Sequence, residues 1–474
     1  MPTPFRRLLV ANRGEIAVRV IRACREMGIE SVAVFSEADR DGLHVRLADR
    51  AYPIGPPAPA QSYLRIEGIL DAARRSGAEA IHPGYGFLSE NPVFAEACEA
   101  AGVVFIGPPA SAMKAMGNKI EARRVMKAAG VPVIPGSDGG VGSEAEIRKV
   151  AGRVGYPILI KAASGGGGRG MRVVRSAKEI GPALDACRSE AGASFGDDTV
   201  YVERYSDRVR HIEVQVLADG RGNVVHLGER ECSIQRRHQK LIEESPSPLL
   251  DAAARASIGE AAVKACKAIG YRSAGTVEFL ADDEGEFHFM EVNARLQVEH
   301  PVTELVTGVD LVKEQFRIAA GEALGLDQAD IGLSGSAIEC RIIAEDPEQG
   351  FLPTPGRIER LRVPGGPGVR DDSGVYEGYT MPIHYDSLIS KLITWGGDRE
   401  EAIDRMRRAL DEYFIEGFPT TIGFLRRVMD HPEFLAGRLH TRFVESMNGG
   451  PPDRARDGDA VTDMAAIAAA LAST

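Results

Sequence analysis

Residues 288–300, which read HFMEVNARLQVEH, alternate apolar side chains with side chains that can bind ligands. A period of two predicts a β-strand, because successive side chains of a strand point to opposite faces of a sheet. The polar face of this strand would carry Glu291, Asn293, Arg295, Gln297 and Glu299. Such a row could hold a metal ion and an anion together. It could also be the solvent side of an amphipathic strand, because alternation is first a sign of burial.

A second acidic residue nearby favours the metal site. Glu278 lies in the apolar run GTVEFLA at residues 275–281, and an acidic turn at residues 282–285 follows it. A hairpin at this turn would place Glu278 opposite Glu291 and close to Asn293. Magnesium takes oxygen ligands, and proteins usually hold it by one or two carboxylates together with substrate phosphates. These residues therefore predict a Mg²⁺ or Mn²⁺ site beside a bound nucleotide.

Composition limits the class of protein. The chain has 474 residues, 44% of them hydrophobic, which is enough for two or three domains with their own cores. A formal net charge of -11 argues against a nucleic-acid partner. No apolar segment approaches a membrane span, and the six cysteines form no CxxC pair, which argues against a zinc site or a disulfide framework. We expect a cytoplasmic protein with no membrane partner.

The chain divides into segments with different patterns. Apolar runs alternate with helical stretches between residues 5 and 108, which predicts βαβ units and a parallel sheet. Later strands and helices are arranged less regularly, so the expected fold class is α/β and α+β. The expected segments are an N-terminal α/β domain at 1–116, a helical linker at 117–134, a small α+β unit with a glycine-rich loop at 135–204, a central subdomain at 205–332, a C-terminal subdomain at 333–448, and a linker with an Ala-rich tail at 449–474.

A glycine-rich loop follows Lys161. Residues 164–170, SGGGGRG, formally match GxGxxG, but the dinucleotide-binding version needs a helix after the loop, and MRVVR reads as a strand. No GxxxxGK[ST] motif occurs. A glycine-rich turn between two strands can lie over a nucleotide, with backbone N–H groups near the phosphates and Lys161 and Lys119 supplying positive charge. A mobile surface hairpin is the alternative.

Residues 229–244, ERECSIQRRHQKLIEE, concentrate basic side chains in an acidic protein. A charge run is usually a solvated face. Gln235, His238 and Lys240 nevertheless combine groups suited to contacting phosphate oxygens. Composition alone leaves both interpretations open.

Eight segments occur along the chain in the order ANRGEIAVR (11–19), HPGYGFLSEN (82–91), MGNK (116–119), KAASGGGGRGM (161–171), RHIEVQV (210–216), ERECSIQRRHQK (229–240), MEVNARLQVEHPVTE (290–304) and ECRIIAEDP (339–347). Together they resemble the biotin carboxylase family of ATP-grasp enzymes and cover nearly the whole chain. The resemblance implies an ATP-grasp fold with an N-terminal Rossmann-like domain, a mobile lid domain and a C-terminal biotin carboxylase domain. It also implies ATP-dependent carboxylation of biotin by bicarbonate through carboxyphosphate.

The resemblance assigns expected roles to individual residues. Expected ATP contacts are Lys119, Lys161, Gly166, Gly167, Glu203, His211, Gln235, His238, Glu278 and Glu291. Expected metal ligands are Glu278, Glu291 and Asn293. The expected bicarbonate and biotin site comprises Lys240, Arg295, Gln297, the backbone of Val298, Glu299 as the base and Arg341 as the partner of the biotin ureido oxygen. These roles suit the chemistry, because bicarbonate is a poor nucleophile until its proton is removed.

The resemblance also implies partners. The sequence contains no Met-Lys-Met biotin-acceptor motif, so we expect a free-standing subunit that acts on a biotin carboxyl carrier protein together with carboxyltransferase subunits. Acetyl-CoA carboxylase of fatty-acid synthesis is the expected complex, and a propionyl-CoA or other acyl-CoA, pyruvate or urea carboxylase is the alternative. A homodimer with Arg19 at its interface is a further expectation. Two other hypotheses are a carbamoyl-phosphate-forming ligase and an ATP-binding module without turnover.

Overall fold

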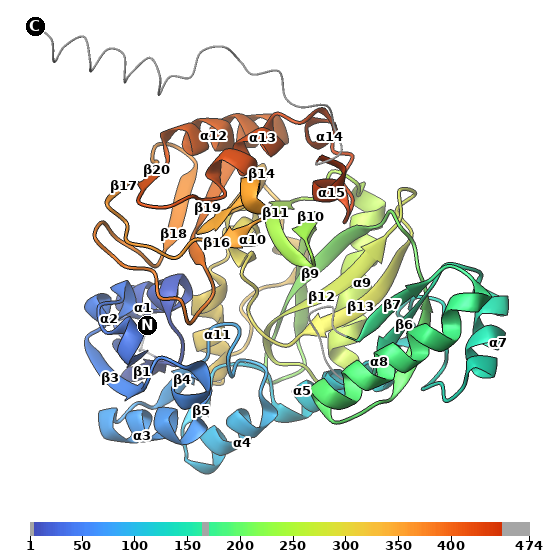
Figure 1. Ribbon diagram of the computed structural model, residues 1–474. Coiled ribbons are helices and arrows are strands. Elements are labelled where there is room, and N and C mark those ends of the chain that lie inside the picture. The colour runs from blue at the N-terminus through green and yellow to red at the C-terminus, as the bar shows by residue number, and fades with distance from the viewer. Residues whose placement is uncertain (1–3, 164–169, 448–474) are drawn as a thin grey trace, which may run out of the picture.

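The computed structural model describes residues 4–163 and 170–447. Its N-terminal part is a five-stranded sheet in the order β3-β2-β1-β4-β5, in which every neighbouring pair is parallel (Figure 1). The strands are β1 Arg7–Val10, β2 Glu30–Ser36, β3 Arg50–Gly55, β4 Ala80–His82 and β5 Val104–Phe105. The helices of this part are α1 Gly14–Glu26, α2 Leu43–Leu47, α3 Ile66–Ser76 and α4 Pro92–Ala100. The predicted parallel sheet is confirmed.

Two helices lead from this sheet to a small antiparallel unit. They are α5 Ala110–Gly117 and α6 Lys119–Ala128, and the Asn118 side chain caps α6 by accepting from two backbone N–H groups. The small unit has the strand order β7-β6-β8, with β6 Ile158–Ala162, β7 Met171–Val174 and β8 Val200–Arg204. Helices α7 Glu144–Val154 and α8 Ile180–Phe195 complete it. Its buried residues form a hydrophobic cluster of their own, so it packs as a separate unit.

The largest element is an eight-stranded sheet in the order β13-β12-β9-β10-β11-β14-β19-β18, and all neighbouring pairs are antiparallel. Its strands are β9 Arg210–Ala218, β10 Val224–Arg236, β11 Gln239–Ser245, β12 Ser273–Ala281, β13 Phe287–Asn293, β14 Ser336–Ile343, β18 Val369–Ser373 and β19 Leu388–Gly396. Strand β14 pairs directly with β11. One continuous sheet therefore carries residues from both the central and the C-terminal segments of the chain.

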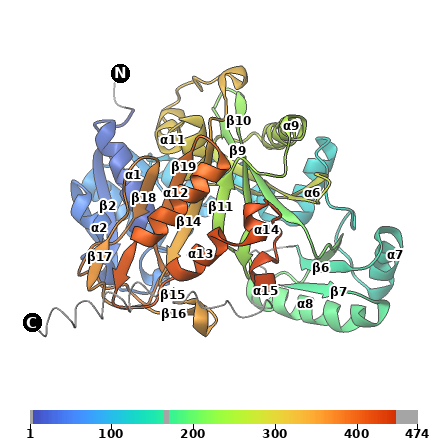
Figure 2. The same cartoon turned by 90° about the horizontal axis from the view of Figure 1, so that it is seen from above.

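Helices and short hairpins complete the molecule around this sheet (Figure 2). Helix α9 Ala252–Ala268 packs on β9 and β10, α10 His300–Thr307 packs on β10, β11, β14 and β19, and α12 Arg399–Glu412 packs on β14 and β19. The remaining elements are α11 Leu311–Ala319, α13 Ile422–Met429, α14 Pro432–Leu435, α15 Phe443–Met447, and the short pairs β15 Glu345–Asp346 with β16 Leu352–Pro353 and β17 Arg360–Arg362 with β20 Phe414–Glu416.

The strand predicted from the alternation at residues 288–300 is shorter than expected. Strand β13 ends at Asn293, and Glu299 is already the N-cap of α10. The chain leaves the sheet because the backbone N–H of Ala294 donates to Glu90 Oε1 at 2.8 Å, and α10 then begins at His300 with Pro301 in its first turn. The prediction that all five polar residues share one strand was therefore wrong for Arg295, Gln297 and Glu299.

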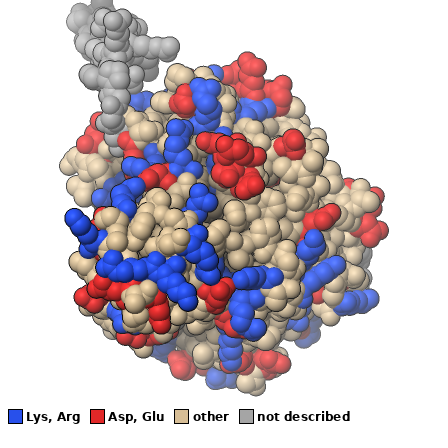
Figure 3. Space-filling model, turned by 90° about the vertical axis from the view of Figure 1, so that its right-hand side faces the viewer, with Lys and Arg blue, Asp and Glu red and all other residues tan. Residues whose placement is uncertain are grey.

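The described part of the chain has few features that point to other classes of protein. All six cysteines are free and buried. Among the described residues, no helix combines the length and the apolar character needed to cross a membrane. Lys and Arg side chains are interspersed with Asp and Glu on the face that Figure 3 shows, and neither sign covers that face alone.

Candidate active site

A cleft of about 1850 Å³ lies where the N-terminal sheet, the small antiparallel unit and the eight-stranded sheet meet. It is lined by all candidate residues that the structure describes, namely Lys119, Lys161, Glu203, His211, Gln235, His238, Lys240, Glu278, Glu291, Asn293, Arg295, Gln297, Val298, Glu299 and Arg341. The other two candidates, Gly166 and Gly167, lie outside the described residues. Candidates spread over more than 200 positions of the sequence thus come together in one cavity.

The predicted hairpin between Glu278 and Glu291 is confirmed. Strands β12 and β13 pair in antiparallel register, with Glu278 directly opposite Glu291 and Thr276 opposite Asn293. Directly opposite residues share one face of a sheet. The two carboxylates and the amide oxygen form an all-oxygen donor set, which fits a hard divalent cation such as Mg²⁺.

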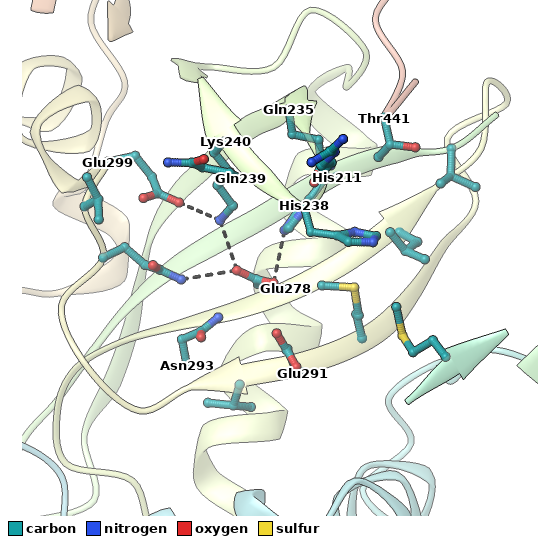
Figure 4. Close-up of a pocket in the computed structure, with 18 of the residues that line it drawn as sticks. His211, Gln235, His238, Gln239, Lys240, Glu278, Glu291, Asn293, Glu299 and Thr441 are labelled. Atoms are coloured by element: carbon teal, nitrogen blue, oxygen red, sulfur yellow. Dashed lines mark hydrogen bonds and ion pairs between the residues drawn. The ribbon is translucent and has the colours of Figure 1, made fainter. Parts of the chain in front are cut away.

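Lys240 occupies the centre of the site (Figure 4). Its Nζ lies 2.6 Å from Glu213 Oε2, 3.0 Å from Glu278 Oε1 and 2.5 Å from Glu299 Oε1. Burial alone would lower the pKa of Lys240, but the surrounding carboxylates raise it well above its usual value. Lys240 is therefore a permanent cation.

Glu299 connects two cations. Its Oε1 accepts from Lys240, and its Oε2 accepts from Arg341 Nη2 at 2.9 Å. Burial by itself would raise the pKa of Glu299, but the charges of Lys240, Arg341 and Arg230 outweigh burial and hold it well below its usual value. Glu299 is thus an ionised carboxylate placed between the cation at the centre of the cleft and the arginine at its far side.

Arg295 and Gln297 lie on the loop between β13 and α10. Arg295 Nε donates to Glu90 Oε2 at 2.9 Å, and Arg295 Nη1 donates to Gln297 Oε1 at 2.8 Å. Gln297 Nε2 in turn donates to Glu278 Oε1 at 3.2 Å. The carbonyl of Val298 accepts from the buried Lys391 on β19 at 2.9 Å. The loop is therefore held by Glu90 from the N-terminal part of the chain and by Lys391 from its C-terminal part.

Two lysines face the other half of the cleft. Lys161 Nζ lies 2.7 Å from Glu203 Oε2 on the neighbouring strand β8, and Lys119 Nζ lies 3.0 Å from Glu291 Oε2. Arg123 contributes a second contact to Glu203, at 2.7 Å. Each lysine is therefore paired with a carboxylate, a contact that a phosphate group could replace.

The basic segment at residues 229–244 forms strands β10 and β11 with a two-residue turn between them. The turn residues Arg237 and His238 have positive φ angles of 48° and 67°, a conformation that non-glycine residues adopt at some cost. Gln235 and Lys240, on the strands, are buried, whereas Arg237 and His238 at the tip are exposed. The segment therefore combines the two interpretations that its composition left open. Its tip is exposed to solvent, and the side chains of Gln235 and Lys240 on its strands line the cleft.

Sequence reasoning missed three buried residues of the site. Glu213 contacts Lys240, Arg230 donates to Glu213, and Glu243 accepts from Arg341 Nε at 2.7 Å. Glu213 could have been found, because in RHIEVQV it lies two residues after His211 and therefore on the same face of a strand. Arg230 and Glu243 pair with residues on other strands, Glu213 and Arg341. The local sequence around Arg230 and Glu243 therefore does not indicate that they belong to the site.

Three family models match the chain. They are "Biotin carboxylase, N-terminal domain" at residues 4–113, "Carbamoyl-phosphate synthase L chain, ATP binding domain" at residues 118–327 and "Biotin carboxylase C-terminal domain" at residues 339–446. Among similar proteins, a biotin carboxylase of Nostoc sp. is 58% identical over 444 residues, 94% of this chain and 99% of the relative. A pyruvate carboxylase subunit of Methanothermobacter thermautotrophicus is also 58% identical, over 94% of this chain and 91% of its own length.

Solved structures agree with these relatives. The Campylobacter jejuni biotin carboxylase in complex with β,γ-ATP has a TM-score of 0.91 and 49% identity, covering 93% of this chain and 99% of its own. The biotin carboxylase domain dimer of Hydrogenobacter thermophilus 2-oxoglutarate carboxylase, in complex with MgADP, ADP and bicarbonate, has a TM-score of 0.89 and 52% identity, covering 93% and 97%.

The fold, the cleft and the ATP-binding domain model define an ATP-grasp ligase. Two of the three matching models describe biotin carboxylases, and they flank the ATP-binding domain on both sides. The chain belongs to the biotin carboxylase family. It is an ATP-dependent carboxylase, and the expected activity, ATP-grasp fold and α/β plus α+β class are confirmed.

Proposed function

We propose that the described cleft binds MgATP in its lysine-rich half and bicarbonate and biotin around Glu299, and that it carboxylates biotin through carboxyphosphate. One observation carries this proposal: a single buried carboxylate, Glu299, contacts both Lys240 and Arg341. The bicarbonate step and the biotin step would thus both take place next to Glu299. The bound ligands of the Campylobacter and Hydrogenobacter structures support the nucleotide, magnesium and bicarbonate parts of this proposal.

Lys119, Lys161, Glu203, His211, Gln235 and His238 would contact the nucleotide. Glu278, Glu291 and Asn293 would hold Mg²⁺, which when bound offsets the charge of the transferring phosphoryl group. Lys240, Arg295, Gln297 and the backbone N–H of Val298 would orient bicarbonate. Fixing the anion in one orientation lowers the entropic cost of its attack on the γ-phosphate.

Glu299 would remove the bicarbonate proton. The neighbouring cations Lys240 and Arg341 depress its pKa, which by itself makes Glu299 a weak base. Bicarbonate bound to Lys240 and Arg295 brings a negative charge next to Glu299, and a nearby like charge raises the pKa of a carboxyl group. Substrate binding would thus make Glu299 a better base at the moment it is needed.

Arg341 would stabilise the enolate of the biotin ureido group after carboxyphosphate breaks down beside it. A guanidinium suits this role, because it stays charged and offers several donors in a fixed geometry. Phosphate released in the cleft would take the ureido proton, and the carbon dioxide formed next to it would be attacked by the ureido nitrogen.

ADP release tests the proposed chemistry directly. The purified chain is given magnesium, ATP and bicarbonate, with and without free biotin. We expect strong stimulation by biotin. ATP turnover that is indifferent to biotin would contradict the proposal, and so would the absence of turnover at any biotin concentration.

Two proposals concern assembly. We infer that biotin reaches the cleft on a carboxyl carrier that works with carboxyltransferase partners, most simply within an acyl-CoA carboxylase, although relatives also include a pyruvate carboxylase subunit. A homodimer is the second proposal, supported by the dimeric Hydrogenobacter domain. Arg19 lines a small surface cavity and is held by Glu304 and Asp310 at 2.9 and 2.7 Å. Sedimentation of wild type and Arg19→Glu tests the dimer, and we expect the variant to shift toward monomer.

A further inference from the structure

Two fully buried carboxyl groups lie behind Arg341. Glu243 on β11 and Glu339 on β14 are direct register partners, and both are 0% exposed. Arg341 lies two residues after Glu339 on the same strand. Directly opposite residues and residues two apart share a face, so all three side chains are on one face of the sheet.

The two carboxyl groups have different partners. Arg341 Nε donates to Glu243 Oε1 at 2.7 Å, and Arg341 Nη2 contacts the same oxygen. Among the described residues, Glu243 Oε2 and both oxygens of Glu339 have no hydrogen-bond partner. Two opposed carboxylates in a dry environment are not both ionised. The member that ionises more readily is therefore Glu243, beside the guanidinium, whereas Glu339 keeps its proton.

The pKa directions agree with this geometry. Burial raises the pKa of Glu339 well above its usual value. Burial also raises the pKa of Glu243, to about 7, while Arg341 acts in the opposite direction.

The contacts of Arg341 divide its guanidinium into two sides. Among the described residues, Arg341 makes its hydrogen bonds and ion pairs through Nε and Nη2, to Glu243 and Glu299. Nη1 is then available to a ligand in the cleft. When Glu299 takes the proton of bicarbonate it loses its charge, and its attraction for Arg341 weakens. Glu243 is the carboxylate that still holds the guanidinium at that stage.

We propose that Glu243 is a positioning residue for the biotin step, which keeps Arg341 aimed at the ureido oxygen while Glu299 carries the bicarbonate proton. The inference rests on the roles proposed above for Glu299 and Arg341. It separates two stages of one reaction, because the bicarbonate stage does not need Glu243 and the biotin stage does.

The experiment compares two activities of one variant. Glu243→Gln keeps the size of the side chain and removes its charge. We expect bicarbonate-dependent ATP hydrolysis without biotin to stay within about threefold of wild type, and the biotin-dependent rate to fall at least about thirtyfold, the usual scale for one charged hydrogen bond. Glu339→Gln is the matched control: it is equally buried and directly opposite, and we expect both rates to remain within about threefold because it replaces a group that is already neutral.

Other outcomes would overturn the inference. If Glu243→Gln lowers bicarbonate-dependent ATP hydrolysis as much as the biotin-dependent rate, at unchanged melting temperature and ATP affinity, Glu243 acts in the bicarbonate stage. If both rates equal those of wild type, Glu243 has no role in either stage. Equal defects in Glu243→Gln and Glu339→Gln would indicate a structural pair. If Glu243→Gln does not fold, Glu243→Asp decides, because it keeps the charge on a shorter side chain. We expect a biotin KM about tenfold higher for Glu243→Asp with unchanged bicarbonate-dependent hydrolysis, and an unchanged biotin KM would contradict the inference.

Arg341→Met separates this inference from the proposed role of Arg341. If Arg341→Met lowers both rates equally, the proposed role of Arg341 fails whatever Glu243 does. If Arg341→Met is selective for the biotin step and Glu243→Gln is not, only the present inference fails. The double variant should be no worse than Arg341→Met alone, because residues that act through one contact are not additive.

Discussion

The two halves of the cleft hold their charges differently. Around Glu299, Lys240 meets three carboxylates, and the side chains of Glu213 and Glu299 are 0% and 1% exposed. In the lysine-rich half, Lys119 pairs with Glu291, and their side chains are 23% and 36% exposed, whereas the neighbouring Lys161–Glu203 pair is buried, at 11% and 5%. The first half comes mainly from the eight-stranded sheet and the loop that follows it, whereas the second is shared between that sheet, the small antiparallel unit and α6.

This difference separates a prebuilt site from an exchangeable one. Removing one member of a buried ion network leaves an uncompensated charge, which is costly, so such a network keeps its geometry during binding. A partly exposed pair of one lysine and one carboxylate contributes little and can be replaced by a phosphate contact. The bicarbonate half would therefore be ready before substrate arrives, and the nucleotide half would rearrange when ATP binds.

The largest effect is expected from replacing the proposed general base of the prebuilt half. Glu299→Gln should lower biotin-dependent ADP release by at least about a thousandfold, because a neutral amide accepts no proton and general-base catalysis contributes up to about 10⁴-fold. ATP affinity, measured by calorimetry, should remain within about threefold, because Glu299 lies away from the lysine-rich half. A normal turnover rate would remove Glu299 from the base role.

The next largest effect is expected at the biotin end of the same half. Arg341→Lys should lower biotin carboxylation about a hundredfold and bicarbonate-dependent ATP hydrolysis much less. The reason is that an ammonium lacks the planar set of donors with which a guanidinium can contact two carboxylates and a ligand at once. Both rates are measured on one preparation. Equal losses would place Arg341 in the bicarbonate stage instead.

The exchangeable half should respond in binding rather than in chemistry. Lys119→Met should raise the KM for ATP about tenfold or more and leave the KM for bicarbonate within about twofold, because it removes one charged phosphate contact. Lys127→Met is the control, since Lys127 also pairs with a carboxylate, Asp138, but is 67% exposed on its side chain. A bicarbonate KM that changes as much as the ATP KM would mean that the two halves are not separable.

The smallest effect is expected from a partly buried carboxyl group for which no compensating lysine or arginine is in contact among the described residues. Asp371 accepts from Tyr413 at 3.1 Å, and burial raises its pKa to about 7. A raised pKa means that the folded state loses stability as pH rises from the unfolded value of about 4 to about 7. Asp371→Asn removes this titration. The variant should therefore melt about 3 °C above wild type at pH 8, with the difference shrinking toward pH 5.

Thermal melts of both proteins at pH 5, 6, 7 and 8 check this prediction. Wild type and Asp371→Asn that differ by the same amount at every pH would contradict it. Glu299 shows the opposite case, since Lys240 and Arg341 offset its burial and lower its pKa.

Local patterns in the sequence are enough to predict one part of the site. The parallel N-terminal sheet follows from its βαβ rhythm, and the hairpin that opposes Glu278 and Glu291 follows from two apolar runs around an acidic turn. The motif segments identified the family and named the candidate residues, because side-chain chemistry is written directly in the sequence.

Which charges compensate each other depends on contacts between segments that are distant in the sequence. The end of β13 at Asn293 depends on Glu90, which lies about 200 residues earlier in the sequence. The partners of Lys240 and Arg341 come from other strands of the sheet and from Glu299 at the start of α10. Glu213, Arg230 and Glu243 belong to the site for that reason. An alternating pattern tells which face of a strand a residue occupies, but the register between distant strands sets which ion it meets and how far its pKa moves.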